Sequence, residues 1–431
     1  MKKYFTAAAA ALICFICCLG FTLACALVPH AAISANALKS ADYYDGRELF
    51  EHINCSDITD NYADTIWLSI AYRFDSAHPL SSAMKAEFPS GGDMNASDAF
   101  ISLVKDEYDG SFADYSRYWH GTASLLRLLF VFFDVWGMKI LSLAAVVTLS
   151  VIYIILLIKR RQYALSIVYV LLFALFRLWN AAVCFEYAPC VIFALLFSII
   201  IMKAHRRGAG ETFYMAFFAA AGILTCYFDF LTTETLTFTL PFLTLFLCRR
   251  ESSAQISIPE RAPAAELLFT VKCGGAWFCS YAFMFAAKWG ISAVMFGGST
   301  LSETMADAAL RISGNIPQEV YGETIGALAN NLGELFPISL ISSTPGRIIA
   351  AAVLFILILC AVYLFRPEGD FDYSLLLLPA LALIPAARYV LLRSHSCLHY
   401  FFTYRALLPS AAALILFLIL GLGFDHRRKR R

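Results

Sequence analysis

The chain has 431 residues, of which 60% are hydrophobic and 15% are charged, and its formal net charge is +1. A mean hydropathy of +0.68 and repeated apolar runs of roughly twenty residues exclude an ordinary soluble protein, because such runs match the thickness of a bilayer core when they are helical. The near-neutral charge excludes a global basic field of the kind that attracts nucleic acid.

The N-terminus combines Lys2 and Lys3 with a long apolar run and the sequence ISANA, which ends at Ala37. This order resembles a signal peptide with an A-x-A cleavage site. The apolar run of roughly 24 residues is long for the apolar region of a signal peptide. We therefore expect residues 1–28 to form an uncleaved first transmembrane helix.

Residues 29–122 form the first large segment expected outside the cytoplasm. It is acidic and aromatic, contains the breaker sequence PSGGD at 89–93, and shows little strand pattern, so we expect helices parallel to the membrane surface. Asp60 and Asp64 in DNYAD are four residues apart and therefore share one helix face. As a like-charged pair they can raise one another's pKa. The commoner role of such a pair is to cap and solvate a surface helix.

The remaining predicted spans occupy 123–296 and 346–431, and between them 297–345 is a second outer segment with two amphipathic helical patterns. Basic residues after every second span, in KRR, KAHRR, CRR, FRP and the terminal HRRKRR, place both termini in the cytoplasm by the positive-inside rule. We predict an all-α polytopic transmembrane helical bundle of about ten spans, at roughly 5–28, 138–158, 163–180, 188–202, 213–231, 235–248, 275–296, 347–365, 373–392 and 406–423.

Unusual polar residues gather at the span ends that this topology places outside. Charges near a membrane are costly and usually face a cavity, a partner or a pathway. Interface belts and snorkelling are the alternative for the basic and aromatic members, but an acid gains nothing from snorkelling, so the set favours a shared polar chamber that opens outward. Its members are Arg117, Tyr118 and His120 in YSRYWHG, Asp229 in YFDFLTTE, Lys288 in AAKWG, and His395, His399 and Arg405 in HSCLHYFFTYR.

Metal chemistry has little support in the sequence. Most of the thirteen cysteines lie in apolar runs, where cysteine behaves as a small hydrophobic residue, and no CxxC pair has histidine partners. We therefore expect no zinc site. Asp60 and Asp64 can hold a divalent cation through oxygen ligands, although two carboxylates alone are not specific for one.

Carboxylates that face cations in an outward chamber fit one kind of chemistry. A carboxylate can accept the proton of a hydroxyl nucleophile while arginine, lysine or histidine stabilises a leaving phosphate. The segments DNYADTIWL, YSRYWHG, YFDFLTTETLTFTLP, WFCSYAFMFAAKW and HSCLHYFFTYRAL resemble those of a group of bacterial polytopic proteins, and that group looks like the GT-C superfamily of membrane glycosyltransferases. The similar segments are short but are spread over most of the chain.

The resemblance implies a helical bundle whose first outer loop carries a catalytic acid and whose donor is a polyprenyl-phosphate sugar. Transfer would take place on the non-cytoplasmic face, usually with inversion at the sugar carbon. Carried over, Asp60 or Asp64 would be the general base. The donor phosphate would be bound by Arg117, His120, Lys288 and Arg405, with Tyr118 beside them. Asp229 would bind a sugar or the acceptor. His395 and His399 would lie where the lipid-linked phosphate arrives from the bilayer.

One departure from the superfamily leaves the identity of the base open. GT-C enzymes often place their acid soon after the first span, whereas Asp60 lies roughly thirty residues beyond it, and Asp42 and Asp45 in DYYD are nearer. We favour Asp60 and Asp64 because their surroundings match the similar group and those of Asp42 do not.

Three functions remain in competition. The first is a glycosyltransferase that acts on an extracytoplasmic glycan, lipid or protein, with membrane lipids around it. The second is a transporter or flippase for a lipid-linked saccharide, which would need polar groups through the bilayer depth, where mid-span charges are sparse. The third is a membrane assembly protein without catalysis, in which the charges at the span ends would point in unrelated directions.

Overall fold

The computed structural model describes residues 1–52, 58–229, 231–256, 263–297, 323–335, 344–365 and 372–423, together with isolated positions between 302 and 309. This part of the chain is almost entirely helical, with two short two-stranded sheets. The prediction of a helical membrane protein is therefore confirmed. The terminal HRRKRR and most of the first amphipathic pattern of 297–345 lie outside the described residues, whereas the second pattern forms α15 (Glu323–Leu335).

Seven helical stretches among the described residues are long and apolar enough to cross a membrane. They are α1 (Lys2–Ala26), α7 (Val135–Lys159), α10 (Ala188–Arg206), α11 (Glu211–Phe228), α13 (Pro263–Phe296), the pair η2 (Tyr373–Leu376) and α17 (Leu377–Leu391), and the run α19 (Tyr400–Thr403), η3 (Tyr404–Leu407) and α20 (Leu408–Gly421). The other three predicted spans also fall on helices, which are α8 (Tyr163–Leu175), α12 (Leu236–Ile256) and α16 (Thr344–Phe365). Helices thus occupy all ten predicted positions, and seven meet the length and composition of a span.

Close packing between α11 and α13 depends on a glycine. A Cβ added at Gly222 of α11 would lie 2.2 Å from the carbonyl oxygen of Trp277 of α13. Small residues allow such an approach between membrane helices. Hydrogen bonds through α12 also join these two helices. Trp277 of α13 donates to the hydroxyl of Thr237 of α12 at 3.2 Å, and that hydroxyl is 2.7 Å from the hydroxyl of Thr225 of α11.

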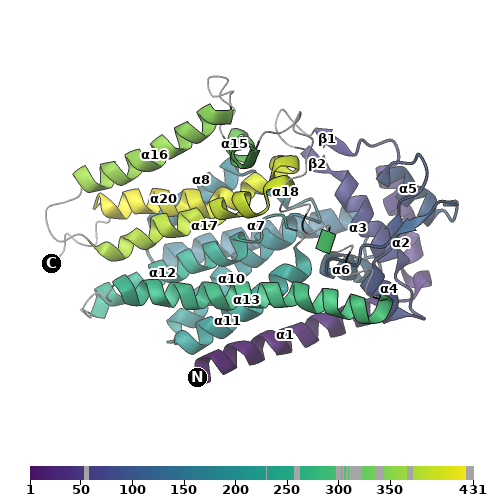
Figure 1. Ribbon diagram of the computed structural model, residues 1–431, viewed down its shortest axis with the longest axis horizontal. Helices are drawn as coiled ribbons and strands as arrows, with labels where there is room; N and C mark the ends of the chain where they lie inside the picture. The colour runs from purple at the N-terminus through teal and green to yellow at the C-terminus, as the bar shows by residue number, and fades with distance from the viewer. Residues whose placement is uncertain are drawn as a thin grey trace.

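Residues 30–129 fold into a small helical body, here called the α2–α6 segment, at one end of the long helices (Figure 1). Its buried core includes Tyr44, Leu68, Phe100 and Leu126. The elements are α2 (His30–Tyr44), β1 (Phe50–His52), β2 (Ile58–Asp60), α3 (Asn61–Arg73), α4 (Pro79–Lys85), β3 (Phe88–Pro89), α5 (Ala96–Val104), β4 (Phe112–Ala113) and α6 (Gly121–Leu129). β1 pairs with β2 and β3 with β4, both antiparallel.

Three buried cations from three helices hold the α2–α6 segment together and onto the bundle. Arg127 of α6 donates to the carbonyls of Ala71 and Tyr72 in the last turn of α3, and to Val28 after α1, at 2.6 to 3.0 Å. Lys288 of α13 donates to the carbonyl of Met84 in α4 at 2.7 Å. These contacts satisfy carbonyls near helix C-termini, where positive charge is also favourable. The third cation is Lys139 of α7, which reaches α3 itself.

Candidate functional site

Asp60 is held at the start of α3 by the hairpin before it. β2 pairs Asp60 with Phe50 of β1, and Asp60 then caps α3 by accepting the N–H of Ala63 at 2.8 Å. The hydroxyl of Tyr187 donates to its other carboxylate oxygen. Desolvation raises the pKa of Asp60 to about 6, although the hydrogen bond from Tyr187 opposes this rise. A carboxylate with a pKa near neutrality and only neutral donors is suited to general-base chemistry.

Asp64 lies one helical turn further along α3 and is more deeply engaged. It is fully buried, it accepts the N–H of Phe185 at 2.9 Å, and its other oxygen pairs with Lys139. Burial raises the pKa of Asp64, and the Lys139 charge opposes the rise. Because a cation already neutralises Asp64, the geometry favours Asp60 over Asp64 as a base. Asp64 and Lys139 instead fix α3 against α7.

Tyr187 connects Asp60 to the C-terminal polar segment. Its ring stacks on Phe402, with ring centroids 4.5 Å apart, and the guanidinium of Arg405 lies 5.8 Å from the Tyr187 ring centroid. Arg405 is 2% exposed and donates through Nε to the carbonyl of Phe176 at 3.1 Å. Among the described residues no carboxylate lies within ion-pair distance of Arg405. A buried guanidinium without an anionic partner is a candidate binding group for an anionic ligand.

The two histidines of HSCLHYFFTYR extend this arrangement. The rings of His395, in α18 (Arg393–Leu398), and His399 are 4.7 Å apart, and the ring of His399 lies 5.2 Å from that of Phe402. A continuous line of side chains therefore runs from Asp60 through Tyr187 and Phe402 to the histidines. We call Asp60, Tyr187, His395, His399, Phe402 and Arg405 the candidate site.

Asp229 lies beside the candidate site rather than in it. It follows α11 and accepts the N–H of Thr232 at 3.2 Å as well as the Thr232 hydroxyl. Glu234 in the same turn pairs with Arg388 of α17 at 2.8 Å, and Arg388 also donates to the hydroxyl of Ser396 at 2.8 Å. Because Ser396 adjoins His395, Arg388 joins the turn of Asp229 to the histidine segment.

The other four predicted residues form a second group with packing partners of their own. His120 immediately precedes α6 and donates through Nε2 to the carbonyl of Tyr115 at 2.7 Å, and burial together with Lys288 lowers its pKa to about 3. Lys288 lies 5.5 Å from the Trp119 ring centroid and binds α4, as described above. The guanidinium of Arg117 lies 4.5 Å from the ring centroid of Tyr115, and the ring of Tyr118 lies 6.0 Å from that of Phe285. The contacts of Lys288 and Tyr118 attach the α2–α6 segment to α13, whereas those of His120 and Arg117 with Tyr115 lie within the segment.

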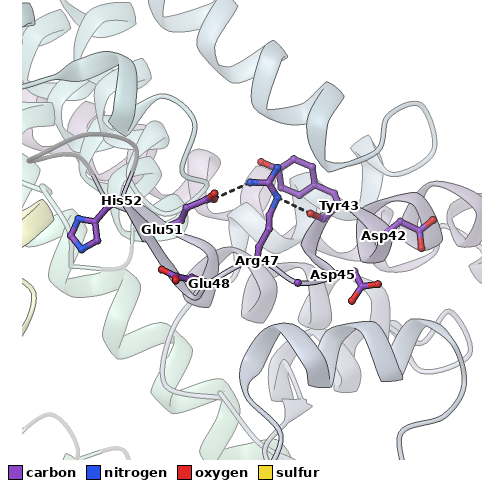
Figure 2. Close-up of a pocket in the computed structure, with 8 residues that line it drawn as sticks. Asp42, Tyr43, Asp45, Arg47, Glu48, Glu51 and His52 are labelled. Atoms are coloured by element: carbon purple, nitrogen blue, oxygen red, sulfur yellow. Dashed lines mark hydrogen bonds and ion pairs between the residues drawn. The ribbon is translucent and has the colours of Figure 1, made fainter.

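An open polar cavity of about 740 Å³ lies beside the strand that leads to Asp60. Figure 2 shows Arg47 between Glu51, with which it forms an ion pair at 2.9 Å, and the carbonyl of Tyr43, which accepts its Nε–H at 2.8 Å. Glu51 pairs with Thr59, next to Asp60. The lining residues are Asp42, Tyr43, Asp45, Gly46, Arg47, Glu48, Glu51 and His52. The two alternative acids of the sequence, Asp42 and Asp45, thus face an exposed cavity.

A bound divalent cation gains no geometric support. Among the residues that the structure describes, no group of three or more His, Cys, Asp or Glu side chains could hold a metal ion. The twelve described cysteines are all free thiols.

Sequence reasoning missed Lys139, Tyr187, Glu234 and Arg388. Glu234 and Arg388 stand in or beside apolar runs, in TTETL and AARYV, and a charge in such a place is itself a signal of a buried partner. Lys139 follows an aromatic helix start and reads as an interface lysine. Tyr187 has no distinguishing pattern, since its importance comes from contacts with residues more than one hundred positions away.

Comparison with known protein families, with curated proteins and with solved structures finds no match for this chain. The fold and the contacts above are therefore the basis for the function.

Proposed function

We propose that this protein is a membrane glycosyltransferase of the GT-C type, which moves a sugar from a polyprenyl-phosphate donor to an acceptor hydroxyl outside the cytoplasm. The observation that carries the proposal is the position of Tyr187, which binds the Asp60 carboxylate through its hydroxyl and contacts Arg405 with its ring. Asp60 and Arg405 thus lie on two sides of the Tyr187 side chain, and Arg405 has no carboxylate partner among the described residues. Glycosyl transfer from a phosphate uses such a pair, because a base accepts the proton of the acceptor and a cation stabilises the leaving phosphate.

The reaction assigns a role to each of these groups. Asp60 accepts the proton of the acceptor hydroxyl, whose oxygen forms a bond to the anomeric carbon of the sugar. The bond between that carbon and the phosphate oxygen breaks, and polyprenyl phosphate leaves with the electron pair. Arg405 stabilises the negative charge on this leaving group.

The surroundings of the site supply the remaining functions of the proposal. His395 and His399 add hydrogen-bond donors for the phosphate near the start of the last apolar helices. The open cavity along residues 42–52 would receive the acceptor; it is lined by Glu51 and His52 of β1, the strand that pairs with β2. Asp64 and Lys139 keep the first turn of α3 in place without taking part in proton transfer. Both termini would lie in the cytoplasm.

The experiment is release of polyprenyl phosphate from a panel of polyprenyl-phosphate hexoses by the purified protein in nanodiscs, with a panel of added alcohols and glycans as acceptors of the sugar. Asp60→Asn should abolish release, because the amide cannot accept the proton. Asp93→Asn, at an exposed acid of the α2–α6 segment that does not line the cavity, is the matched control and should retain it. Release by Asp60→Asn at the wild-type rate would rule out Asp60 as the base. Movement of unchanged lipid-linked sugar across vesicles, without release, would instead identify a transporter.

A further inference from the structure

Two carboxylates of the turn between α11 and α12 lie near the guanidinium of Arg388 in α17. Glu234 pairs with Arg388 through one carboxylate oxygen, and Asp229 interacts electrostatically with both Glu234 and Arg388. All three residues are at most 6% exposed. When every group is ionised, this cluster carries one net negative charge.

A net charge in such a place is costly unless a further cation is bound. The second oxygen of Glu234 is buried and has no hydrogen-bond partner in the described part of the chain. The other titratable side chains near the cluster are Cys190 of α10, Cys226 of α11, Tyr281 of α13 and Tyr389 of α17, and a thiol or a phenol cannot supply a positive charge. His395 of α18 is the sequence neighbour of Ser396, whose hydroxyl accepts from Arg388. The contacts therefore leave an acceptor position for one small cation.

We infer that the cluster of Asp229, Glu234 and Arg388 is a proton-binding site, in which one proton, held by either Asp229 or Glu234, neutralises the excess charge. A proton fits better than a metal ion, because the described residues include no group of three or more His, Cys, Asp or Glu side chains that could hold a metal. This inference does not depend on the proposed function.

The pH range and the consequence of proton binding follow from the same contacts. Burial and the Glu234 charge raise the pKa of Asp229 to about 6, so the site loads as the pH falls below neutrality. Arg388 also donates to the carbonyl of Leu231 and to the hydroxyl of Ser396. Because the same guanidinium holds both the turn and α18, the charge state of the cluster acts on the segment that carries His395.

The test compares the thermal midpoints of variants that change the net charge of the cluster, in the purified full-length protein. Asp229→Asn and Glu234→Gln each remove one negative charge, so each single variant leaves a neutral cluster and should fold with little change in its thermal midpoint at alkaline pH. The double variant leaves Arg388 buried without a counter-ion. Its midpoint should fall by much more than the sum of the two single changes. A double variant whose loss equals that sum overturns the proposal.

Infrared difference spectra between acidic and alkaline pH supply a direct readout. The pKa of Asp60 is also raised to about 6, so the spectra of variants must be compared to separate the two acids. Asp60→Asn and Asp229→Asn should each remove a different component of the carboxylic-acid band. If Asp229→Asn does not fold, Glu234→Gln serves the same purpose. If Asp229→Asn and Glu234→Gln both keep every component of the wild-type carboxylic-acid band, the cluster does not bind a proton. A transition that shifts when sodium replaces choline at constant ionic strength identifies sodium as the ligand and also overturns the proposal.

Discussion

Tyr187 shows how a single hydroxyl can set the properties of a carboxylate that is far away in the sequence. Its O–H stabilises the ionised form of Asp60, whereas burial favours the protonated form, and the balance leaves the pKa of Asp60 raised to about 6. The ring of Tyr187 meanwhile rests on Phe402. The hydroxyl and the ring can therefore be separated by one substitution.

We expect Tyr187→Phe to move the acidic limb of the activity profile to higher pH. The variant keeps the stacked ring but removes a hydrogen bond that lowers the pKa of Asp60, so that pKa rises further and a higher pH is needed to ionise the base. Initial rates of polyprenyl phosphate release across pH measure the shift. Tyr169→Phe is the control, because Tyr169 is another buried tyrosine and its hydroxyl contacts Ser150 instead. An unchanged limb in Tyr187→Phe would contradict the contact.

The ion pair of Asp64 and Lys139 gives a second expectation at this scale. Asp64→Asn or Lys139→Met alone leaves the other charge buried without its partner, which should lower the free energy of unfolding by about 3–5 kcal/mol. The double variant removes both charges and should recover much of that loss. Denaturation of the purified protein followed by tryptophan fluorescence measures all four proteins of the cycle. Additive losses would show that the two charges do not depend on each other.

At the scale of elements, helix ends and helix contacts decide where the functional groups lie. α3 begins at the Asp60 cap and ends on carbonyls that Arg127 binds, so both of its ends are fixed by side chains. The first turn of α3 is therefore a rigid support for Asp60. α11 and α13 approach each other at Gly222, and the turn of Asp229 and Glu234 follows directly after α11.

Two glycines of the same helix pair should respond differently to alanine. In Gly222→Ala the new Cβ meets the Trp277 carbonyl oxygen, and we expect a loss of about 1–3 kcal/mol from overpacking. Gly275→Ala in α13 meets nothing within 4 Å and should be neutral or stabilising by about 0.5–1 kcal/mol. Thermal midpoints in one detergent compare them. Equal effects at the two positions would show that α11 and α13 are not in backbone contact at Gly222.

At the scale of the whole molecule, the long helices form one bundle and the α2–α6 segment is attached to one end of it (Figure 1). The attachment uses buried cations of α6, α7 and α13. The candidate site lies where this segment, the turn after α9 (Leu178–Ala181) and the α18–α19 region meet, so three parts of the chain must assemble before the site exists.

The proposed topology can be tested with single exposed cysteines in intact cells. We expect Asp93→Cys, in the α2–α6 segment, to react with a membrane-impermeant maleimide, and Arg207→Cys, between α10 and α11, to react only after lysis. The physical reason is the excess of basic residues in the connection 203–207, which favours the cytoplasmic side. Labelling in the reverse order would place the candidate site on the cytoplasmic face.

The order of helices follows from local information, and most of it could be predicted from the sequence. Apolar runs gave the positions of all ten predicted helices, because a helix in lipid satisfies its own backbone hydrogen bonds wherever the run is long enough. The spacing of Asp60 and Asp64 likewise gave a shared helix face, since that depends only on the helical period. The small core of the α2–α6 segment was not evident, because it combines short elements that have little pattern individually.

Which charges meet depends on the tertiary structure. The residues predicted to face outward divide into groups, because packing gives some of their cations carbonyl partners and leaves Arg405 without a carboxylate among the described residues. The set is Arg117, Tyr118, His120, Asp229, Lys288, His395, His399 and Arg405. The pairs of Asp64 with Lys139 and of Glu234 with Arg388 join residues 75 and 154 positions apart. Composition and periodicity determine how costly a buried charge is, but only the packed helices determine which side chain neutralises it.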